Sequence, residues 1–317
     1  AGIAICGMGG AAIAGDLARS YWEHDSPMPV TVVRHYTPAA YINNLWYILA
    51  SSYSGNTPET LAAVDTLHER RCQSVLALTS GGELARRAEK HRWRTVSLPS
   101  GMMPRAALGY SLGATLMALG RWGVVGNNPS AVAKELESNV AEATAFLESC
   151  AVTWGKETPE SSNNAKQMAQ SLTGHAVIVV GVTGSTDVAA VRLKSQLCEN
   201  AKLPAFATAI PEANHNEIVG TELLKQMSIS PVVVLLRSAD DHKDIARQRI
   251  VLDDLLTDKG VAVVDLMAKG DNRLQRLLYL VHLGDYISYY AAILNGVDPT
   301  PIAPIEHLKA ALASHTT

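Results

Sequence analysis

The sequence contains few of the features that mark metal centres and disulfide frameworks. Its four cysteines, Cys6, Cys72, Cys150 and Cys198, are far apart and form no CxxC pair. This spacing excludes the ligand pattern of a structural zinc site and the cysteine density of a disulfide scaffold. The same usage is typical of a reducing compartment. We therefore expect a cytoplasmic protein with no metal.

Strong charge and long apolar runs are also missing. The formal net charge is -3, whereas a protein that coats nucleic acid normally carries a basic face. The longest mostly apolar stretch, Ala106–Gly120, falls short of the roughly 20 residues that a membrane-spanning helix needs. No basic segment followed by an apolar core marks a signal peptide. We expect neither a nucleic acid nor a membrane as partner.

The chain begins in the apolar run GIAIC without an initiator Met, so we expect residues upstream of it.

The first half of the chain alternates between strand and helix patterns. With 317 residues, 47% of them hydrophobic and only 5% aromatic, the chain is long enough for two α/β domains with aliphatic cores. Segments with helical spacing, such as Thr60–Arg71 and Glu83–His91, separate short apolar runs. Such alternation predicts parallel strands joined by right-handed crossovers in a doubly wound sheet. The predicted strands are Gly2–Cys6, Val30–Arg34, Trp46–Ser51, Ser74–Thr79 and Thr95–Leu98.

The second half repeats the pattern after two long helices and a linker. The helices are Arg105–Trp122 and Ser130–Cys150, and the linker is the polar segment Lys156–Asn164. We therefore predict one domain over residues 1–155 and a second over 156–317. The strands predicted for the second domain are Ala176–Val180, Pro204–Ala207, Val232–Leu236 and Val261–Leu266. Its predicted helices are Ser185–Ala201, Asp241–Leu256, Asn272–Asn295 and Pro304 to about Ala313.

Each predicted domain opens on the same arrangement. The segments Ile3–Ala11 and Ile178–Ser185 both read as an apolar strand, a glycine turn and the start of a helix. The two halves are thus predicted to be diverged copies of one fold.

The glycine turn after the first strand is suited to an anion. In Gly7-Met8-Gly9-Gly10 the lack of side chains lets backbone N–H groups approach a ligand, and the helix dipole adds to the attraction. Gly7, Gly9 and Ala12 also satisfy the dinucleotide pattern GxGxxA. That pattern needs an acidic residue after the second strand. The strand ends in Arg34-His35 instead, which disfavours NAD and leaves NADP open.

A second anion-binding pattern follows the third predicted strand. In Ser52-Tyr-Ser-Gly-Asn-Thr57-Pro58-Glu-Thr60, Thr57 is suited to be the N-cap of a helix with Pro58 as its first residue. The hydroxyls of Ser52, Ser54 and Thr57 can then converge with the helix N–H groups. Such a cradle suits a phosphate monoester and needs neither lysine nor metal. The alternative is a capped helix after a serine-rich turn.

The order of these motifs resembles one family. The SxSGxTxET string is similar to the phosphate loop of sugar-isomerase (SIS) domains, and the whole chain resembles the bifunctional phosphoglucose/phosphomannose isomerases. The resemblance implies two tandem SIS domains, each a flavodoxin-like parallel sheet flanked by helices. Besides GMGG and the serine loop, the strings that carry it are Pro104–Tyr110, Glu199–Lys202, Asn214–Glu217 and Pro304–Lys309.

The resemblance implies an activity and a role for each matching residue. The reaction is the interconversion of glucose 6-phosphate, mannose 6-phosphate or both with fructose 6-phosphate, through a cis-enediol and without a cofactor. The substrate would contact Gly9, Gly10, Ser52, Ser54 and Thr57, the last three through its phosphate. Glu199 would be the base, Arg105 would stabilise the enediolate, and His215 and Lys309 would assist ring opening.

General chemistry agrees with these roles. One carboxylate can move a proton between C1 and C2, and a fixed guanidinium stabilises the oxyanion that develops. A histidine has the right pKa range for ring opening. From the residues alone, each side chain also has a structural explanation: a solvated Glu199 or Lys309, a helix-start Arg105, or a His215 in an ion-pair cluster.

One departure and two alternatives remain at this point. Ala11 stands where the family usually has serine, which removes one hydroxyl and about 0.5–1.5 kcal/mol of binding. An amino-sugar phosphate isomerase would share the phosphate loop, and a sugar-phosphate sensor would share the fold without catalysis. The resemblance also implies a homodimer, with His215 acting across the subunit boundary.

Overall fold

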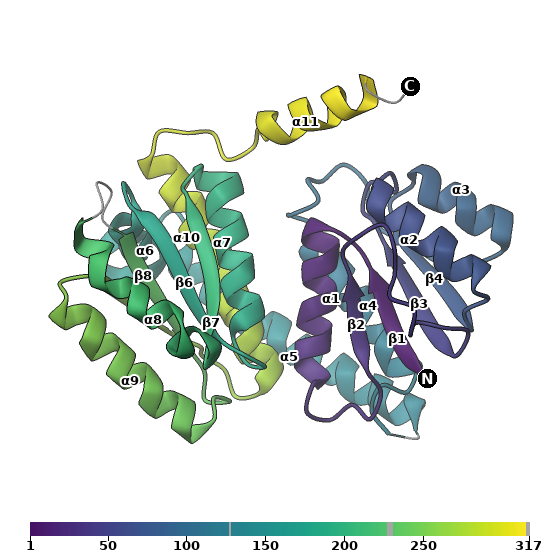
Figure 1. Cartoon of the computed structure of the whole chain (residues 1–317), viewed down its shortest axis with the longest axis horizontal. Helices are drawn as coiled ribbons and strands as arrows, with labels where there is room; N and C mark the ends of the chain where they lie inside the picture. The colour runs from purple at the N-terminus through teal and green to yellow at the C-terminus, as the bar shows by residue number, and fades with distance from the viewer. Residues whose placement is uncertain (127, 227–230, 315–317) are drawn as a thin grey trace. The chain divides into compact units, whose positions relative to one another are not determined.

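The computed structural model of the chain describes residues 1–126, 128–226 and 231–314. It divides into two compact units, Ala1–Glu142 and Ala143–Thr317, and each contains its own helix-flanked sheet (Figure 1). The division lies inside the long helix α5 (Pro129–Trp154). The boundary expected at residue 155 lies at the end of the same helix. Because α5 continues through the division, no break in the sequence pattern marks it.

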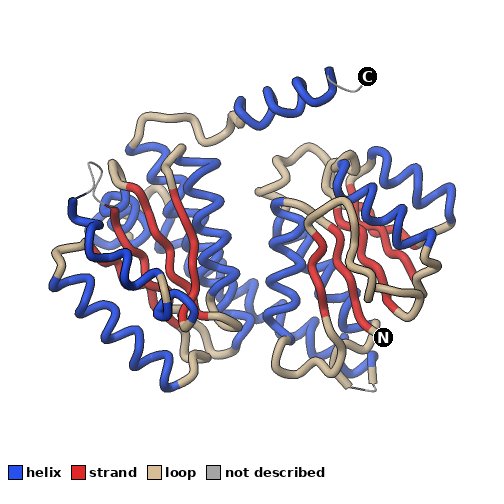
Figure 2. Tube along the Cα trace, viewed as in Figure 1, coloured by secondary structure: helices blue, strands red, loops and turns tan. Residues whose placement is uncertain are grey.

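The first unit is built on a five-stranded parallel sheet (Figure 2). β1 lies next to β2 on one side and β3 on the other, so the strand order β2-β1-β3-β4-β5 reverses direction between β1 and β3. This is the flavodoxin-like order, which confirms the predicted fold class. The strands are β1 Gly2–Cys6, β2 Val30–Val33, β3 Trp46–Ser51, β4 Ser74–Thr79 and β5 Arg94–Ser97.

Helices cover both faces of this sheet because successive residues of a strand face opposite sides. Ala4 and Cys6 belong to the core beneath α2 and α3. Ile5 faces α1, where Gly15 packs so closely that a Cβ there would lie 2.9 Å from Ile5 Cγ2. α4 packs on α1. The helices are α1 Gly9–Trp22, α2 Pro58–Glu69, α3 Gly82–His91 and α4 Leu108–Arg121.

The second unit repeats this order in four parallel strands, β7-β6-β8-β9. β6 therefore corresponds to β1, β7 to β2 and β8 to β3, which confirms the predicted pair of doubly wound domains. The strands are β6 Ala176–Val182, β7 Ala205–Ile210, β8 Pro231–Arg237 and β9 Ala262–Met267.

The helices of the second unit also lie on two faces of its sheet (Figure 1). On one face α9 packs Leu252 and Leu256 against Val180 and Val233, and on the other α7, α10 and α6 pack together. The helices are α6 Asn164–Leu172, α7 Asp187–Ala201, α8 Glu217–Gly220, α9 Lys243–Asp258, α10 Arg273–Leu294 and α11 Ala303–Ser314. Short 3-10 helices are η1 Glu160–Ser162, η2 Glu212–His215 and η3 Thr221–Gln226.

Among the described residues, α10 is the one helix long and apolar enough to cross a membrane. The sequence-based search overlooked it because it considered only the run Ala106–Gly120. Within the second unit α10 packs on α7 and α6, and 56% of its most apolar window is buried. A core helix of a folded domain has this character.

One predicted helix and the predicted linker differ from the structure. α4 begins at Leu108, so Arg105 lies in the turn before the helix and not in its first turn. Pro104 precedes it, and the N–H groups of Ala106 and Ala107 bond to Met103 O in that turn. The predicted linker contains η1 and ends where α6 begins; Asn163 caps α6 by accepting a hydrogen bond from Lys166 N at 3.1 Å.

Candidate functional site

Three loops lie at the carboxyl edge of the first sheet, after β1, β3 and β5. In doubly wound folds ligands bind at this edge, where the strand order reverses. Here the reversal lies between β1 and β3. The predicted site residues of this unit all lie on these loops or at the helix starts beside them: Gly9, Gly10, Ser52, Ser54, Thr57 and Arg105.

The turn between β1 and α1 presents bare backbone. Gly9 has φ +51°, and apart from its chain neighbours and the backbone of its own helix, no atom of the described residues lies within 4 Å of the place that a Cβ would occupy. Met8, the N-cap of α1, makes no side-chain capping bond. At Gly10 a Cβ would lie 3.1 Å from Pro104 O and 3.8 Å from Arg105 Cα. The turn therefore offers helix N–H groups to an anion and lies against the loop that carries Arg105.

The serine loop between β3 and α2 brings two hydroxyls together. Ser52 Oγ lies 2.8 Å from Thr57 Oγ1. Thr57 is the N-cap of α2 with Pro58 as the first residue, as predicted, but its hydroxyl does not cap the helix. Ser54 is exposed, and its Oγ accepts from Asn56 N at 3.3 Å. The start of α2 is thus lined by hydroxyls without a capping side chain, which suits a bound anion.

The loop that follows β4 fixes the shape of the serine loop. Gly55 has φ +70°, and a Cβ there would lie 1.8 Å from Gly81 O, so this position requires glycine. Asn56 Oδ1 accepts from Glu83 N at 2.9 Å. The sequence pattern predicts no role for either residue. Their partners are more than twenty residues away in the chain, so only the Gly-Asn pair inside the serine motif pointed to a turn there.

Tyr53 links the serine loop to the loop that carries Arg105. Its hydroxyl donates to Pro99 O at 2.8 Å and accepts from Met102 N at 2.9 Å. Arg105 itself is buried, with 7% of its surface exposed. A guanidinium held in a water-poor setting stabilises developing negative charge better than one in bulk water. Tyr53 is a further residue that the sequence analysis did not single out.

Glu199 lies in the last turn of α7 in the second unit and is half-buried. Lys202 follows in the left-handed conformation, with φ +57°. Its Nζ donates to Glu199 O at 2.6 Å and to Pro301 O at 2.8 Å. The turn that carries Glu199 is therefore tied to the segment leading into α11. Ser195, one helical turn earlier, turns its hydroxyl back to Val191 O at 2.9 Å.

The other two predicted residues of this unit are exposed on different elements. His215 ends η2, which follows the carboxyl end of β7. Lys309 lies on α11. Glu199 lies at the opposite edge of the sheet from His215, because α7 runs back to the amino end of β7, where Cys198 Sγ contacts Ala205 O at 3.8 Å. The six residues of β7 span about 20 Å at roughly 3.3 Å per residue, so the second unit does not bring Glu199 and His215 together.

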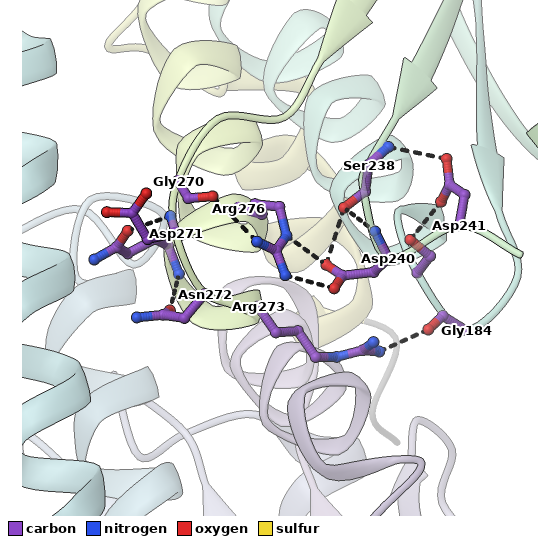
Figure 3. Close-up of polar contacts among 11 residues, drawn as sticks. Gly184, Ser238, Asp240, Asp241, Gly270, Asp271, Asn272, Arg273 and Arg276 are labelled. Atoms are coloured by element: carbon purple, nitrogen blue, oxygen red, sulfur yellow. Dashed lines mark hydrogen bonds and ion pairs between the residues drawn. The ribbon is translucent and has the colours of Figure 1, made fainter.

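In the second unit, the position that corresponds to the phosphate loop is occupied by carboxylates. Ser238-Ala-Asp240-Asp241 follows β8 as the serine loop follows β3. Figure 3 shows Asp240 between Arg276 and Ser238: it accepts from Arg276 at 2.6 and 2.9 Å and from Ser238 Oγ at 2.9 Å. Asp241 accepts from Ser238 N at 2.9 Å and Ser185 Oγ at 2.6 Å. The donors that could hold an external anion are thus engaged by the chain itself.

Burial and hydrogen bonding move the pKa values of these two carboxyls in opposite directions. Burial raises the pKa of Asp241 above its usual range, although Ser185 and Ser238 donate to it. Burial also acts to raise the pKa of Asp240, but the hydrogen bonds from Arg276 and Ser238 and the Arg276 charge outweigh it and hold that pKa below its usual range. Asp240 is therefore an internal counter-ion for Arg276.

Other candidate ligands have weaker support in the structure. The part of the chain that the structure describes contains no group of three or more His, Cys, Asp or Glu residues arranged to hold a metal ion. Arg34 is the residue after the second strand that kept NADP as a possible ligand. Its side chain forms an ion pair with Asp16 of α1. Cys6 is buried beneath α2, and burial raises the pKa of its thiol to about 12, so it is not a reactive thiolate near neutral pH.

Comparison with known proteins gives one family. Residues 161–312 match the family described as bacterial phospho-glucose isomerase C-terminal SIS domain. A bifunctional phosphoglucose/phosphomannose isomerase from Caldicellulosiruptor bescii is 38% identical over 311 residues, which cover 98% of this chain and 89% of the relative. The protein of the same name from Aquifex aeolicus is 34% identical, with 99% and 91% covered.

A solved structure supports the fold independently of sequence identity. The glucosamine-6-phosphate deaminase of Thermotoga maritima superimposes with a TM-score of 0.65 at 13% identity, covering 94% of this chain and 86% of that one. At 13% identity the match supports the fold alone. The regions that match the named isomerases cover nearly the whole chain and so include both units. The chain belongs to the bifunctional phosphoglucose/phosphomannose isomerase family.

Proposed function

We propose that this protein interconverts glucose 6-phosphate, mannose 6-phosphate or both with fructose 6-phosphate through a cis-enediol. The observation that carries the proposal is the hydroxyl-lined, uncapped start of α2 at the point where the strand order of the first sheet reverses. A sugar phosphate whose phosphate binds there can contact the backbone N–H groups of the turn at Gly9. Membership of the isomerase family gives the reaction.

The residues divide into binding and reacting groups. Ser52, Ser54 and Thr57 bind the phosphate. Glu199 takes the proton from C2 of the aldose and returns it to C1 of the enediol, so that no net proton is consumed. Arg105 stabilises the negative charge on the enediolate oxygens. His215 and Lys309 open the sugar ring, His215 as general acid or base.

The site is completed in a homodimer. The two edges of the second sheet separate Glu199 from His215 within one chain by about the length of β7. A two-fold partner can supply the missing histidine, because a two-fold interface places the same surface of each chain against the other. We therefore propose that His215 acts on the substrate bound to the partner chain.

The four unpaired cysteines fit a reducing, cytoplasmic setting.

The experiment is a coupled assay of the purified chain without added metal. Fructose 6-phosphate is measured after glucose 6-phosphate or mannose 6-phosphate is supplied. Turnover of either substrate supports the proposal. Glucosamine 6-phosphate is the comparison substrate, because an amino-sugar isomerase shares the phosphate loop. Turnover of glucosamine 6-phosphate without turnover of glucose 6-phosphate or mannose 6-phosphate overturns the proposal. Binding without any turnover favours a sensor.

A further inference from the structure

A polar seam joins the helix that carries Glu199 to the core helix of the second unit. Arg192, Gln196 and Asn200 recur every four residues along α7 and form one stripe. All three are buried, with 3%, 4% and 8% of their surfaces exposed. A stripe of three buried polar residues is unusual on a helix that packs inside a domain.

Two residues of α10 receive the hydrogen bonds of this stripe. Asp285 accepts from Arg192 Nε and Nη2, each at 3.1 Å, and from Gln196 Nε2 at 2.8 Å. Ser288 Oγ accepts from Asn200 Nδ2 at 2.9 Å and donates to Asp285 O at 2.9 Å. The contacts fix both the rotation of α7 about its axis and its position along α10.

The seam has features that stability alone does not explain. Burial of the Arg192 charge carries a desolvation penalty, which pairing with the partly exposed Asp285 does not have to offset in full. Gln196 Oε1 is buried without a hydrogen-bond partner in the described residues, which is also unfavourable. Apolar contacts would join the helices without these costs but would hold their rotation less strictly, since hydrogen bonds are directional.

The rotation of α7 decides where the Glu199 carboxylate lies. Glu199 precedes Asn200, so its side chain leaves the helix about 100° from the seam. A rotation of the helix by about 10° moves the end of a side chain that lies 5–6 Å from the axis by about 1 Å. Displacement of a reacting group by about 1 Å can cost about 100-fold in rate. The seam ends one residue from the base, where this geometry matters most.

We propose that Asp285 and Ser288 are positioning residues for Glu199: through Arg192, Gln196 and Asn200 they hold α7 in the rotation that aims the carboxylate at the substrate. The inference rests on the proposed function, in which Glu199 is the base. Neither residue touches the substrate. Their loss should therefore reduce the rate of proton transfer and leave binding of the phosphate in the first unit nearly unchanged.

The test compares Ser288→Ala and Asp285→Asn with a matched control in the full-length protein. Because Asp285→Asn removes the negative charge beside buried Arg192 and can unfold the unit, Ser288→Ala carries the decision if Asp285→Asn does not fold. The control is Asp265→Asn. Asp265 of β9 pairs with Arg249 at 3.4 Å and with Arg237, and both of these partners lie outside α7. Its side chain is 30% exposed against 31% for Asp285.

The expected result is a split between kcat and KM. For fructose 6-phosphate, kcat falls about tenfold or more in both seam variants, while KM changes less than about threefold. Asp265→Asn lowers the melting temperature by a similar amount and keeps the kcat and KM of the wild type below its transition.

Two results would overturn the inference while the proposed function stands. One is a Ser288→Ala enzyme with kcat within twofold of wild type. The other is an equal loss of kcat in Asp265→Asn, which would make the effect one of general stability. If the wild-type protein isomerises no aldose 6-phosphate, it is the proposed function that fails, and the inference fails with it.

Discussion

The hydroxyl oxygens of Ser52 and Thr57 lie 2.8 Å apart at the start of α2, and neither caps the helix. An N-cap residue normally uses its side chain to satisfy one of the first N–H groups. Here the Thr57 hydroxyl makes no capping bond and instead lies within hydrogen-bond distance of the Ser52 hydroxyl. The arrangement places two hydroxyls beside the positive end of the helix dipole, where a phosphate is favoured.

The first prediction follows from this cradle. Combined Ser54→Ala and Thr57→Ala should raise KM for fructose 6-phosphate roughly 100-fold or more, because each hydrogen bond to a charged group contributes about 1.5–3 kcal/mol. The measurement is steady-state kinetics with titration of inorganic phosphate as a competing anion. Thr66→Ala is the control: Thr66 lies on the same helix and donates to Ala62 O, and its variant should keep the wild-type KM. A double variant that binds as tightly as wild type would show that the phosphate lies elsewhere.

A second prediction concerns the link between the serine loop and Arg105. Tyr53→Phe removes the hydroxyl that bonds both Pro99 O and Met102 N. We expect kcat to fall about tenfold with a smaller change in KM, because the buried Arg105 loses its fixed position while the phosphate hydroxyls remain. Tyr41→Phe, a change at an exposed tyrosine of the same unit, is the control. Equal kinetics of Tyr53→Phe and wild type would show that the Tyr53 hydroxyl does not position Arg105 for catalysis.

The third prediction tests whether His215 is shared between subunits. Glu199→Gln and His215→Ala proteins are each expected to be inactive. A mixed dimer contains one site with an intact Glu199 and an intact His215 from the partner, so it should have about half the activity of a wild-type dimer. The dimers are mixed by refolding, separated by two affinity tags and assayed. Purified mixed dimers without activity would place both residues of a site in one chain, and sedimentation of an active monomer would exclude sharing altogether.

The fourth prediction concerns pH and the internal counter-ion of the second unit. The pKa of Asp240 lies below its usual value of 3.8, so its ionised form stabilises the fold above that pH, and this contribution is lost as the pH falls through the lower folded-state pKa. Asp240→Asn should therefore lower the melting temperature most near neutral pH, and the difference from wild type should shrink below about pH 3.8. Calorimetry between about pH 2 and pH 7 measures this. Asp254→Asn, at an exposed position on α9, is the control. A difference that stays constant with pH would contradict the ion pair.

Much of the fold could be predicted because it is encoded locally. The predicted runs Trp46–Ser51 and Ser74–Thr79 coincide with β3 and β4, since short apolar segments between turn residues have few other ways to be buried. The glycine and serine motifs were found for the same reason: their residues are contiguous. Helix α6 was missed because its nine residues begin at the end of a polar segment typical of a linker.

The contacts that shape the site could not be predicted, because they join distant parts of the chain. Tyr53 is 46 residues from Pro99, and Arg192 is 93 from Asp285. Nothing in the periodicity around these residues identifies their partners. The carboxylates that occupy the corresponding position in the second unit were missed for a similar reason, since Asp240 and its partner Arg276 are 36 residues apart in the chain. The sequence thus predicted which loops form the candidate site and left open how they are held.

The most direct measurement is the fate of the C2 proton in Glu199→Gln. Glutamine keeps the shape of the side chain and removes its basicity, so phosphate binding should stay nearly intact. Isomerisation should fall by about 10²–10⁴-fold, the usual effect of losing a general base. Exchange of the aldose C2 proton with deuterium from solvent, followed by NMR, should be lost in parallel with turnover, because the same carboxylate removes that proton. Continued exchange at near the wild-type rate would contradict the account and make Glu212 or Glu217 the next candidates for the base.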